Sequence, residues 1–511
     1  MILFETILLL LLGAALLSLL AGRLGVPYPT LLALGGVVVA LVPGTPRLDL
    51  PPDLILALFV APVLLDAAHD TSLRDLRTNW RPVLSLVVVA VGLTTIVVAW
   101  VVRQFLPDMP WAAAIALGAL LAPPDAVAAL AVMRSVSPPH RIRAILEGES
   151  LLNDASSLLI YNLALAAVAV GAFRPADALP AFGLVTVGSV VVGWILAKVV
   201  IRLTAPIGYP AIATILQFVT TFGVWILAER LQLSGVVTIV VFGLTAGRRS
   251  SASLPTTVRV QSFATWETVT LVLNVLAFTM IGLQLRPILE RLDNAELATY
   301  PLYALAILAV VVGVRLAWVL VYGAAHRLSR AAADAPRTWA ETLKSGLLVG
   351  WSGMRGIVTL AAALAIPEGF PYRDFIVLAA FVVVLGTLVI QGLTLKPLLR
   401  ALRFPADTVI TDEIAVARER ALDATLRVLG EDATPAAGRL RREYGEALGF
   451  ARAGDDPRAS SDNALRQRVI PAARHAIDGL RADGIIGDEA YRSVEEELDR
   501  LELSSRPPEV S

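Results

Sequence analysis

The chain has 511 residues, of which 56% are hydrophobic, and its mean hydropathy is +0.71. A soluble protein of this length would expose a strongly apolar surface, so the composition favours a polytopic membrane protein. The formal net charge is zero, cysteine is absent, and the four histidines are far apart in the sequence. These features exclude disulfides and thiol chemistry, argue against a His-rich metal site, and leave nucleic-acid binding without a basic patch.

The charges divide the chain into two parts. Residues 1–404 hold 28 Lys and Arg against 21 Asp and Glu, whereas residues 405–511 hold 15 against 22. We therefore predict a membrane domain over 1–404 and an acidic, helical, cytoplasmic domain over 405–511. In the second domain, residues 410–450 and 463–503 have helical periodicity on either side of a linker. Its sequence leaves open whether this domain is an inert solvated unit or serves regulation or dimer contacts.

Apolar segments separated by polar, Pro or Gly breaks predict thirteen membrane-spanning helices in the first domain. The first segment could be a signal peptide, but Glu5 precedes it and Arg23 follows it, and this order of charges favours a retained helix. The predicted segments are 3–22, 28–43, 53–69, 82–105, 111–133, 144–171, 180–203, 211–229, 234–247, 262–285, 301–325, 345–366 and 375–399.

The loops between these segments differ in positive charge. If the N-terminus lies outside, the inside loops hold 16 Lys and Arg, and the outside loops and helix ends hold seven. This alternation agrees with the positive-inside rule. We therefore predict a multi-pass protein with its N-terminus outside and, because the number of spans is odd, its C-terminal domain in the cytoplasm.

Two of the predicted helices are interrupted near their middle. The segment 111–133 contains Pro124 and Asp125, and the segment 345–366 contains three glycines around Arg355. A single kink would mean little, because Pro and Gly are common in membrane helices. If the seventh segment links two halves, however, both breaks fall on the fifth helix of their half. Because transporters with inverted repeats place their sites at such breaks, we predict two inverted six-helix repeats.

Six charged residues are the clear cases of a charge inside the predicted spans, where a central Asp or Arg costs roughly 2.5–3.5 kcal/mol unless it is paired or faces water. A spacing of four residues puts Ser150 and Asp154 on one helix face, and Glu149 and Asn153 on another. The acids outnumber the arginines by two, which favours a monovalent cation or protons over an anion. The six residues are Asp66, Asp125, Glu149, Asp154, Arg315 and Arg355.

Several of these charges also have a structural explanation. Glu149 could form a purely structural ion pair with an arginine. Asp66 could lie at a helix end in contact with water, and Glu147 lies one turn nearer the predicted cytoplasmic end than the other acids. Asp154 is the strongest candidate for a functional carboxylate, because it lies deepest along an otherwise apolar helix.

The sequence around these charges resembles the monovalent cation:proton antiporters, in the branch shared by archaeal and bacterial sodium/proton antiporters and eukaryotic sodium/proton exchangers. Residues 148–154 read GESLLND, which resembles the signature of that family, and APPDAVAALAV places Asp125 29 residues before Asp154. The resemblance covers roughly residues 1–400. Further matching motifs are VLLDAAHDTSLRDLR with Asp66, VGVRLAWV with Arg315, and WSGMRGIVTLAAALAIP with Arg355.

The resemblance implies that Asp154 alternately holds the transported cation and a proton. Asp125, on the broken helix, would shape the site, and Ser150 and Asp66 would add oxygen ligands. Many family members read Thr-Asp-Pro where this chain reads Pro-Asp-Ala, with Pro124 in place of the threonine. Position 124 could therefore contribute only its backbone carbonyl, which leaves the preference among Na⁺, K⁺ and Li⁺ open.

The resemblance also assigns supporting residues. Glu149 would pair with Arg315, and Asn153 would lie near Arg355. Because Asn153 comes directly before Asp154, the chain resembles the electroneutral branch of the family, whose members exchange one cation for one proton. The resemblance further implies a homodimer in the cell inner membrane, in which a core bundle moves against a dimerisation domain, and it implies no cofactor.

These features predict a secondary active transporter, with Na⁺ as the foremost substrate. A cation channel or uniporter remains an alternative, since it would pass ions without a counter-moving proton. A cation-sensing membrane protein would bind the ion without net flux. An enzyme is disfavoured, because the predicted spans hold no His or Cys pair, metal-ligand set or nucleophile–base pair.

Overall fold

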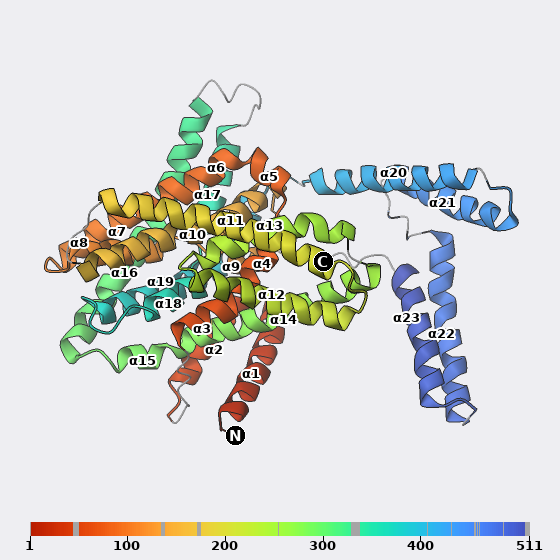
Figure 1. The fold of residues 1–511 in the computed structure, drawn as a ribbon, viewed down its shortest axis with the longest axis horizontal. Coiled ribbons are helices and arrows are strands. Elements are labelled where there is room, and N and C mark those ends of the chain that lie inside the picture. Colours follow the sequence, from red (N-terminus) through yellow and green to blue (C-terminus); the bar gives the residue numbers. More distant parts are fainter. Residues whose placement is uncertain are drawn as a thin grey trace. The chain divides into compact units, whose positions relative to one another are not determined.

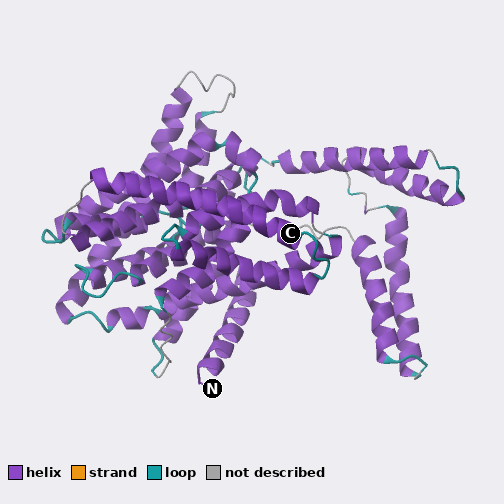
Figure 2. Cartoon of the chain, in the orientation of Figure 1, coloured by secondary structure: helices purple, strands orange, loops and turns teal. Residues whose placement is uncertain are grey.

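The computed structural model of the chain divides into two compact units, Met1–Phe404 and Pro405–Ser511. Throughout the residues that it describes, the regular elements are helices (Figures 1 and 2). The assignment of the first unit to the membrane and of the second to the cytoplasm stays a prediction. The described residues are 2–43, 51–133, 138–170, 175–253, 255–328, 338–405, 407–430, 432–453, 456, 458, 460–483 and 485–505.

Helices occupy the places of the first six predicted segments. The third and fourth segments each contain a π-helix between two α-helices, and the fifth is broken into two helices, as its prolines predict. The elements are α1 (Ile2–Leu24), α2 (Tyr28–Ala40), α3 (Pro52–Ile55), η1 (Leu56–Val60), α4 (Ala61–Asp70), α5 (Leu73–Thr78), α6 (Trp80–Leu84), η2 (Ser85–Ala90), α7 (Val91–Phe105), α8 (Trp111–Leu121), α9 (Ala126–Met133) and α10 (His140–Val170).

The remaining seven predicted segments also lie on helices. The tenth begins earlier than predicted, and the twelfth is broken at its glycines, as expected. The elements are α11 (Pro175–Thr204), α12 (Pro210–Arg230), α13 (Gly235–Ser253), α14 (Thr256–Leu283), α15 (Leu285–Leu289), α16 (Asn294–Leu328), α17 (Trp339–Trp351), α18 (Ile357–Leu364) and α19 (Arg373–Leu402).

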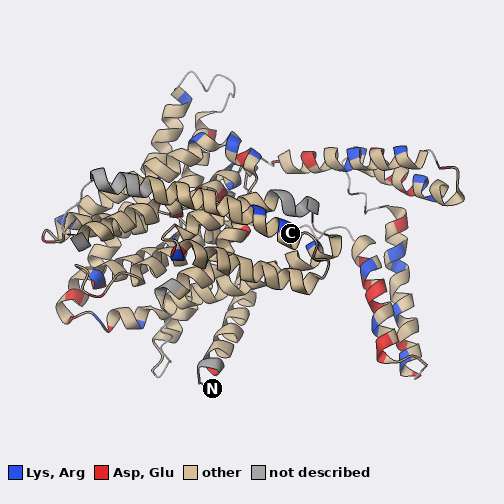
Figure 3. Cartoon of the chain, viewed as in Figure 1, with Lys and Arg blue, Asp and Glu red and all other residues tan. Residues whose placement is uncertain are grey.

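Eight helices in the described part of the chain are long and apolar enough to cross a membrane. Three further apolar helices are shorter: Tyr28–Ala40, Trp111–Leu121 and Gly235–Gly247. Lys, Arg, Asp and Glu are sparse along the helices of the first unit (Figure 3). This pattern is typical of a multi-pass membrane protein, whereas the count of thirteen spans stays a prediction.

The helices of the first unit pack into two groups. In the first group, α7 packs against α8 and α16, α8 packs against α10, and α16 packs against α17 and α19. In the second group, α2 packs against α14, and α13 packs against α4, α11 and α12. The groups meet where α10 lies against α4 and α13, and where α18 lies against η1 and α14. Both broken helices belong to the first group, beside this boundary.

The second unit contains two pairs of packed helices. Each predicted helical stretch is divided by a turn that its periodicity did not reveal. In the first turn, the Thr434 hydroxyl accepts a hydrogen bond from the backbone N–H of Ala437 (3.3 Å), and Pro435 begins the next helix, where its missing N–H is not needed. Charged side chains cover these helices (Figure 3). They are α20 (Val409–Gly430), packed on α21 (Pro435–Ala453), and α22 (Ser461–Ala482), packed on α23 (Asp488–Ser505).

Candidate functional site

The break between α8 and α9 is shaped by its prolines and by one carboxylate. Pro123 and Pro124 lack the N–H groups that would continue α8, so the helix ends at Leu121. Asp125 then begins the next helix: its Oδ1 accepts a hydrogen bond from the backbone N–H of Val127 (2.8 Å). The backbone N–H of Asp125 donates to the carbonyl of Met354 in the other break (2.6 Å). The two breaks are therefore in direct contact.

Arg355 joins the two broken helices from the other side. Its side chain is fully buried, and its Nε donates to the carbonyl of Leu121 (3.0 Å) at the C-terminal end of α8. Its Nη2 lies 3.3 Å from the carbonyl of Ala122, and its Nη1 donates to the carbonyl of Gly353. The last carbonyls of a helix have no partners within the helix and carry partial negative charge, so a guanidinium satisfies and neutralises them. Arg355 thus stabilises the unwound backbone of both breaks.

Glu149 and Arg315 form a buried ion pair beside the breaks, as the family resemblance implies. Arg315 Nη2 donates to Glu149 Oε2 (2.8 Å), Nη1 donates to Oε1, and Nη2 also lies 3.2 Å from the carbonyl of Val349. Glu149 and Arg315 are 1% and 3% exposed. Because both oxygens of the carboxylate are engaged by one guanidinium, this pair fixes α10 to α16 and to the end of α17.

Asn153 connects α10 with the break in the preceding helix. Its Nδ2 donates to the carbonyl of Pro124 (3.1 Å), and its buried Oδ1 has no hydrogen-bond partner within the described residues. Arg355 binds carbonyls two and three residues before Pro124, so both side chains hold the same break from different helices. The Pro124 carbonyl already accepts one hydrogen bond, which leaves one lone pair for a cation.

Asp154 follows Asn153 on α10. The residue is only 7% exposed, and no hydrogen bond or ion pair to its carboxylate is present in the described part of the chain. The carboxylate of Asp125 is close enough for the two negative charges to repel each other. A buried carboxylate without a partner is costly, which makes Asp154 a candidate for binding a proton or a cation.

The other two predicted ligands occupy different positions. Ser150 lies one turn before Asp154 on α10 and is partly buried. Asp66, also partly buried, lies on α4 in the second helix group, where it lines a cavity between α4 and helices α11 to α14. The structure therefore brings Asp125, Asn153 and Asp154 together at the breaks and places Asp66 on the opposing helix group.

Four further side chains hold the site in place and were not singled out from the sequence. On α10, the Ser156 hydroxyl donates to the carbonyl of Val87 in η2 (2.9 Å). Three more hydrogen bonds act in the same way: Ser157 Oγ donates to the carbonyl of Ala119 (2.9 Å), Tyr161 Oη donates to the carbonyl of Ala362 (2.8 Å), and the Arg355 N–H donates to Thr387 Oγ1 (3.0 Å). Two adjacent serines in an apolar helix indicated that hydrogen-bond partners lie nearby. The sequence did not show which partners, because these are carbonyls of helices that are distant along the chain.

Gly356 gives a direct test of how tightly the breaks are packed. A Cβ added there would overlap the carboxylate of Asp125 and lie 2.6 Å from its Cγ, whereas a Cβ at Gly313 meets nothing within 4 Å. We expect Gly356→Ala to destabilise the protein by about 1–3 kcal/mol, as overpacked cores do. Gly313→Ala, inside α16, should be neutral or slightly stabilising. Equal melting temperatures of the two variants in detergent would contradict this packing.

Comparison with known proteins agrees with the motifs. Residues 7–401 match the model of the family described as sodium/hydrogen exchanger, transmembrane. The chain is 30% identical over 518 residues to a Mycobacterium tuberculosis protein named as an uncharacterized Na⁺/H⁺ exchanger, with 96% of this chain and 94% of that protein covered. It is 28% identical over 502 residues to the sodium, potassium, lithium and rubidium/H⁺ antiporter of Bacillus subtilis, covering 94% and 74% of the two chains.

A solved structure shares the fold. The sodium proton antiporter MjNhaP1 from Methanocaldococcus jannaschii, determined at pH 8, matches with a TM-score of 0.60 and 17% sequence identity. The match covers 79% of this chain and 99% of that structure. The family match over most of the chain and the apolar helices lead to one conclusion: this chain is a multi-pass membrane protein that belongs to the sodium/hydrogen exchanger family of antiporters.

Proposed function

We propose that the protein is a secondary active transporter that exchanges a monovalent cation for a proton at Asp154. The observation that carries this proposal is the buried carboxylate of Asp154, which faces a second carboxylate and has no partner in the described residues. The names of the relatives support a monovalent cation as the substrate: one is named as a Na⁺/H⁺ exchanger, and the Bacillus subtilis protein as a sodium, potassium, lithium and rubidium/H⁺ antiporter. Na⁺ is the foremost candidate, with K⁺ and Li⁺ next.

The arrangement explains how one site can couple two ions. Two nearby carboxylates cannot both stay charged without a counter-ion, so the site binds either a proton or a cation. Hard cations prefer oxygen ligands, and the Asp154 carboxylate, the Ser150 hydroxyl, the Pro124 carbonyl and Asp125 can supply them. Asp66 would add an oxygen from α4 when the two helix groups approach. Because the proton and the cation compete for Asp154, binding of either one displaces the other.

Alternating access would use the two helix groups. The breaks, Asp154 and their supporting arginines all belong to the first group, which includes α8 to α10 and α16 to α19. The second group, with α2, α4 and α11 to α14, would remain the scaffold against which the first group moves. Two inverted repeats would give this movement two equivalent end states. We propose that the scaffold also forms a homodimer in the cell inner membrane.

Electroneutral exchange is the expected stoichiometry. Asn153 is neutral and fully buried next to Asp154, so it carries no proton to exchange, and Asp154 alone would release one proton for each cation bound. In proteoliposomes, a membrane potential set with valinomycin should then leave the rate of pH-driven Na⁺ uptake unchanged. A rate that follows the potential would contradict one-for-one exchange, and Na⁺ current without proton movement would establish the channel alternative.

A further inference from the structure

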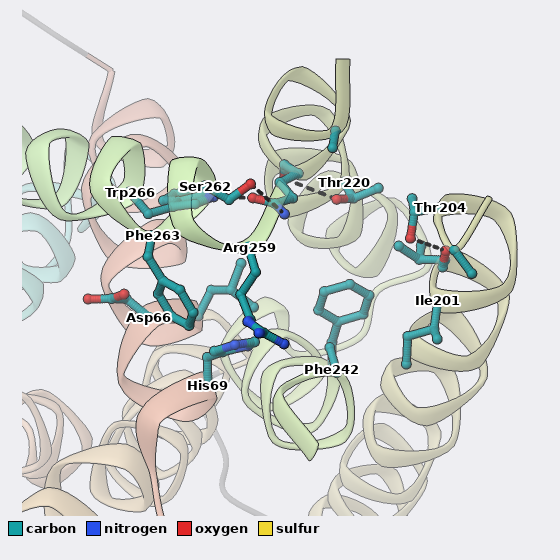
Figure 4. Close-up of a pocket in the computed structure, with 16 residues that line it drawn as sticks. Asp66, His69, Ile201, Thr204, Thr220, Phe242, Arg259, Ser262, Phe263 and Trp266 are labelled. Atoms are coloured by element: carbon teal, nitrogen blue, oxygen red, sulfur yellow. Dashed lines mark hydrogen bonds between the residues drawn. The ribbon is translucent and has the colours of Figure 1, made fainter. Parts of the chain in front are cut away.

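The second unit exposes an apolar surface that the proposed transport site does not use. The cavity between α4 and helices α11 to α14 is different, because Asp66 lines it and makes it part of that site (Figure 4). In the second unit, α20 has apolar side chains on two faces, and α21 packs against one of them. None of the residues of α20 is buried. Its other apolar face is therefore left in contact with solvent.

This exposed face carries a regular apolar stripe. Its members follow one another at intervals of four, three, four, three and four residues, which is the spacing of the a and d positions of a coiled coil. The first two members and the last are 42%, 45% and 76% exposed, and the three alanines between them are exposed as well. The α20 stripe consists of Ile410, Ile414, Ala417, Ala421, Ala424 and Val428.

The α20 stripe lies on the side of the helix away from α21. Glu419 and Asp423 accept hydrogen bonds from Arg452 of α21, at 2.9 and 3.3 Å. Each of these two acids lies two residues from a member of the stripe, which is about 200° around an α-helix. Leu422 and Leu426, on the same side as the acids, are partly buried. Thus α20 has two apolar seams, and its own chain covers only one of them.

The narrowness of the stripe indicates what covers it. Its members stay within about 40° of one line along the helix, and such a strict a and d stripe is typical of a coiled-coil seam. A helix that lies on a membrane surface instead combines Trp, Phe or Leu on one face with a polar face rich in Lys and Arg. The stripe contains none of those three apolar residues, and α20 holds four acids against three arginines. Another helix is therefore the expected partner.

The charges beside the stripe favour a second copy of α20 in the parallel orientation. In an antiparallel pair with facing stripes, Arg420 would lie opposite Arg420 of the second copy, and Arg418 opposite Arg418. Such like-charge contacts disfavour a pairing. In a parallel pair in register, Arg420 would face the neutral Thr425, and Arg418 would face the acidic Glu413. The parallel pair therefore avoids both repulsive contacts.

The position of α20 in the chain makes such a pair attainable. Alanines at three of the six stripe positions bury little area, so the contact is weak by itself. However, α20 begins seven residues after the end of α19, so a homodimer of the first unit would hold two copies at high effective concentration. We propose that α20 pairs with α20 of a second copy of this chain, as a parallel coiled coil formed through the α20 stripe.

The test is disulfide cross-linking of the full-length protein in native membranes. The chain has no cysteine, so a single introduced cysteine reports one contact. In a parallel pair in register, equal positions of the stripe face each other within reach of a disulfide. Ala424→Cys lies on the stripe. Val416→Cys is the matched control, because Val416 is 50% exposed on the same helix but lies about 120° from the stripe.

We expect Ala424→Cys to form covalent dimers about tenfold faster than Val416→Cys under mild oxidation. Adding Ala421→Glu to Ala424→Cys puts a charge into the seam while keeping a good helix former, and should remove this difference. Adding Val416→Glu to Ala424→Cys should leave the fast cross-linking unchanged, because position 416 lies outside the seam.

Three results would overturn the proposal. Equal rates for Ala424→Cys and Val416→Cys would mean that the two copies merely lie near each other. Dimers that form only between Ala417→Cys chains and Ala421→Cys chains would mean an antiparallel pair. No cross-linking of Ala424→Cys would mean that the stripe does not pair with itself, and labelling by a water-soluble maleimide would then tell an open stripe from one covered by lipid. None of these results depends on exchange activity.

Discussion

Asp154→Asn should abolish cation:proton exchange while leaving the protein folded and inserted. The amide has nearly the same shape as the carboxylate, but it can neither release a proton nor carry the charge that attracts a cation. The variant also removes the repulsion between Asp154 and Asp125, so we expect its stability to be maintained or increased. Uptake of radioactive Na⁺ into proteoliposomes, driven by a pH gradient, should fall to the level of empty vesicles.

The control for this experiment is the same substitution at an exposed acid. Asp374 lies in the first turn of α19, and its side chain is 44% exposed. Asp374→Asn should retain the exchange rate of the unmodified protein. If Asp154→Asn instead transports Na⁺ as fast as the control variant does, the proton and the cation do not compete at Asp154.

The second large effect concerns the ion pair of Glu149 and Arg315. Glu149→Gln should destabilise the protein by about 3–5 kcal/mol, because it leaves a guanidinium charge buried without its counter-ion. The double variant Glu149→Gln/Arg315→Gln should recover part of this loss, since both charges are removed together. The melting temperatures of the detergent-solubilised variants, together with their yields in the membrane, measure the loss of stability in the single variant and its recovery in the double variant.

An exposed pair of the same chemistry provides the reference. Arg286 and Glu290 lie one turn apart, with Arg286 Nε 2.8 Å from Glu290 Oε1, and their side chains are 41% and 38% exposed. Glu290→Gln should cost no more than about 0.5 kcal/mol. A melting temperature for Glu149→Gln as high as that of Glu290→Gln would show that the buried pair does not stabilise the fold.

The breaks could be predicted from the sequence because their causes are local. Paired prolines in the middle of a helix remove two backbone donors and clash with the preceding turn, and the glycines around Arg355 lower helix propensity because glycine loses more backbone entropy on folding. The pairing of Glu149 with Arg315 came from the motif, since spacing along the chain says nothing about two residues on different helices. Local signals thus predicted where the helices end, and resemblance predicted which charges meet.

Other parts of the site had no local signal. The Asp125 N–H donates to the backbone carbonyl of Met354, and the Arg355 N–H donates to the side-chain hydroxyl of Thr387; both bonds join residues that are distant in the sequence. The π-helix η2, whose Val87 carbonyl accepts a hydrogen bond from Ser156, has the composition of an ordinary apolar helix. The turn between α20 and α21, which ends at Thr434, could not be predicted either, because the helical period of charged and apolar residues continues across it.

The replacement of threonine by Pro124 acquires a physical meaning in the structure. In this chain position 124 offers only a carbonyl, and Asn153 already donates to it. The hydrogen bond orients this carbonyl but also withdraws electron density from it, which favours a weakly held cation at that ligand. We therefore propose that Asp154 and Ser150 contribute more to cation binding here than position 124 does.

The most direct measurement uses everted membrane vesicles from cells that lack their own antiporters. Respiration acidifies the vesicle interior and quenches a fluorescent dye, and Na⁺, K⁺ and Li⁺ are then added in turn. Cation:proton exchange predicts that at least one of these cations restores the fluorescence, and that the Asp154→Asn variant does not respond. The absence of any response from fully inserted protein, from mildly acidic to alkaline pH, would contradict exchange as the function of this site.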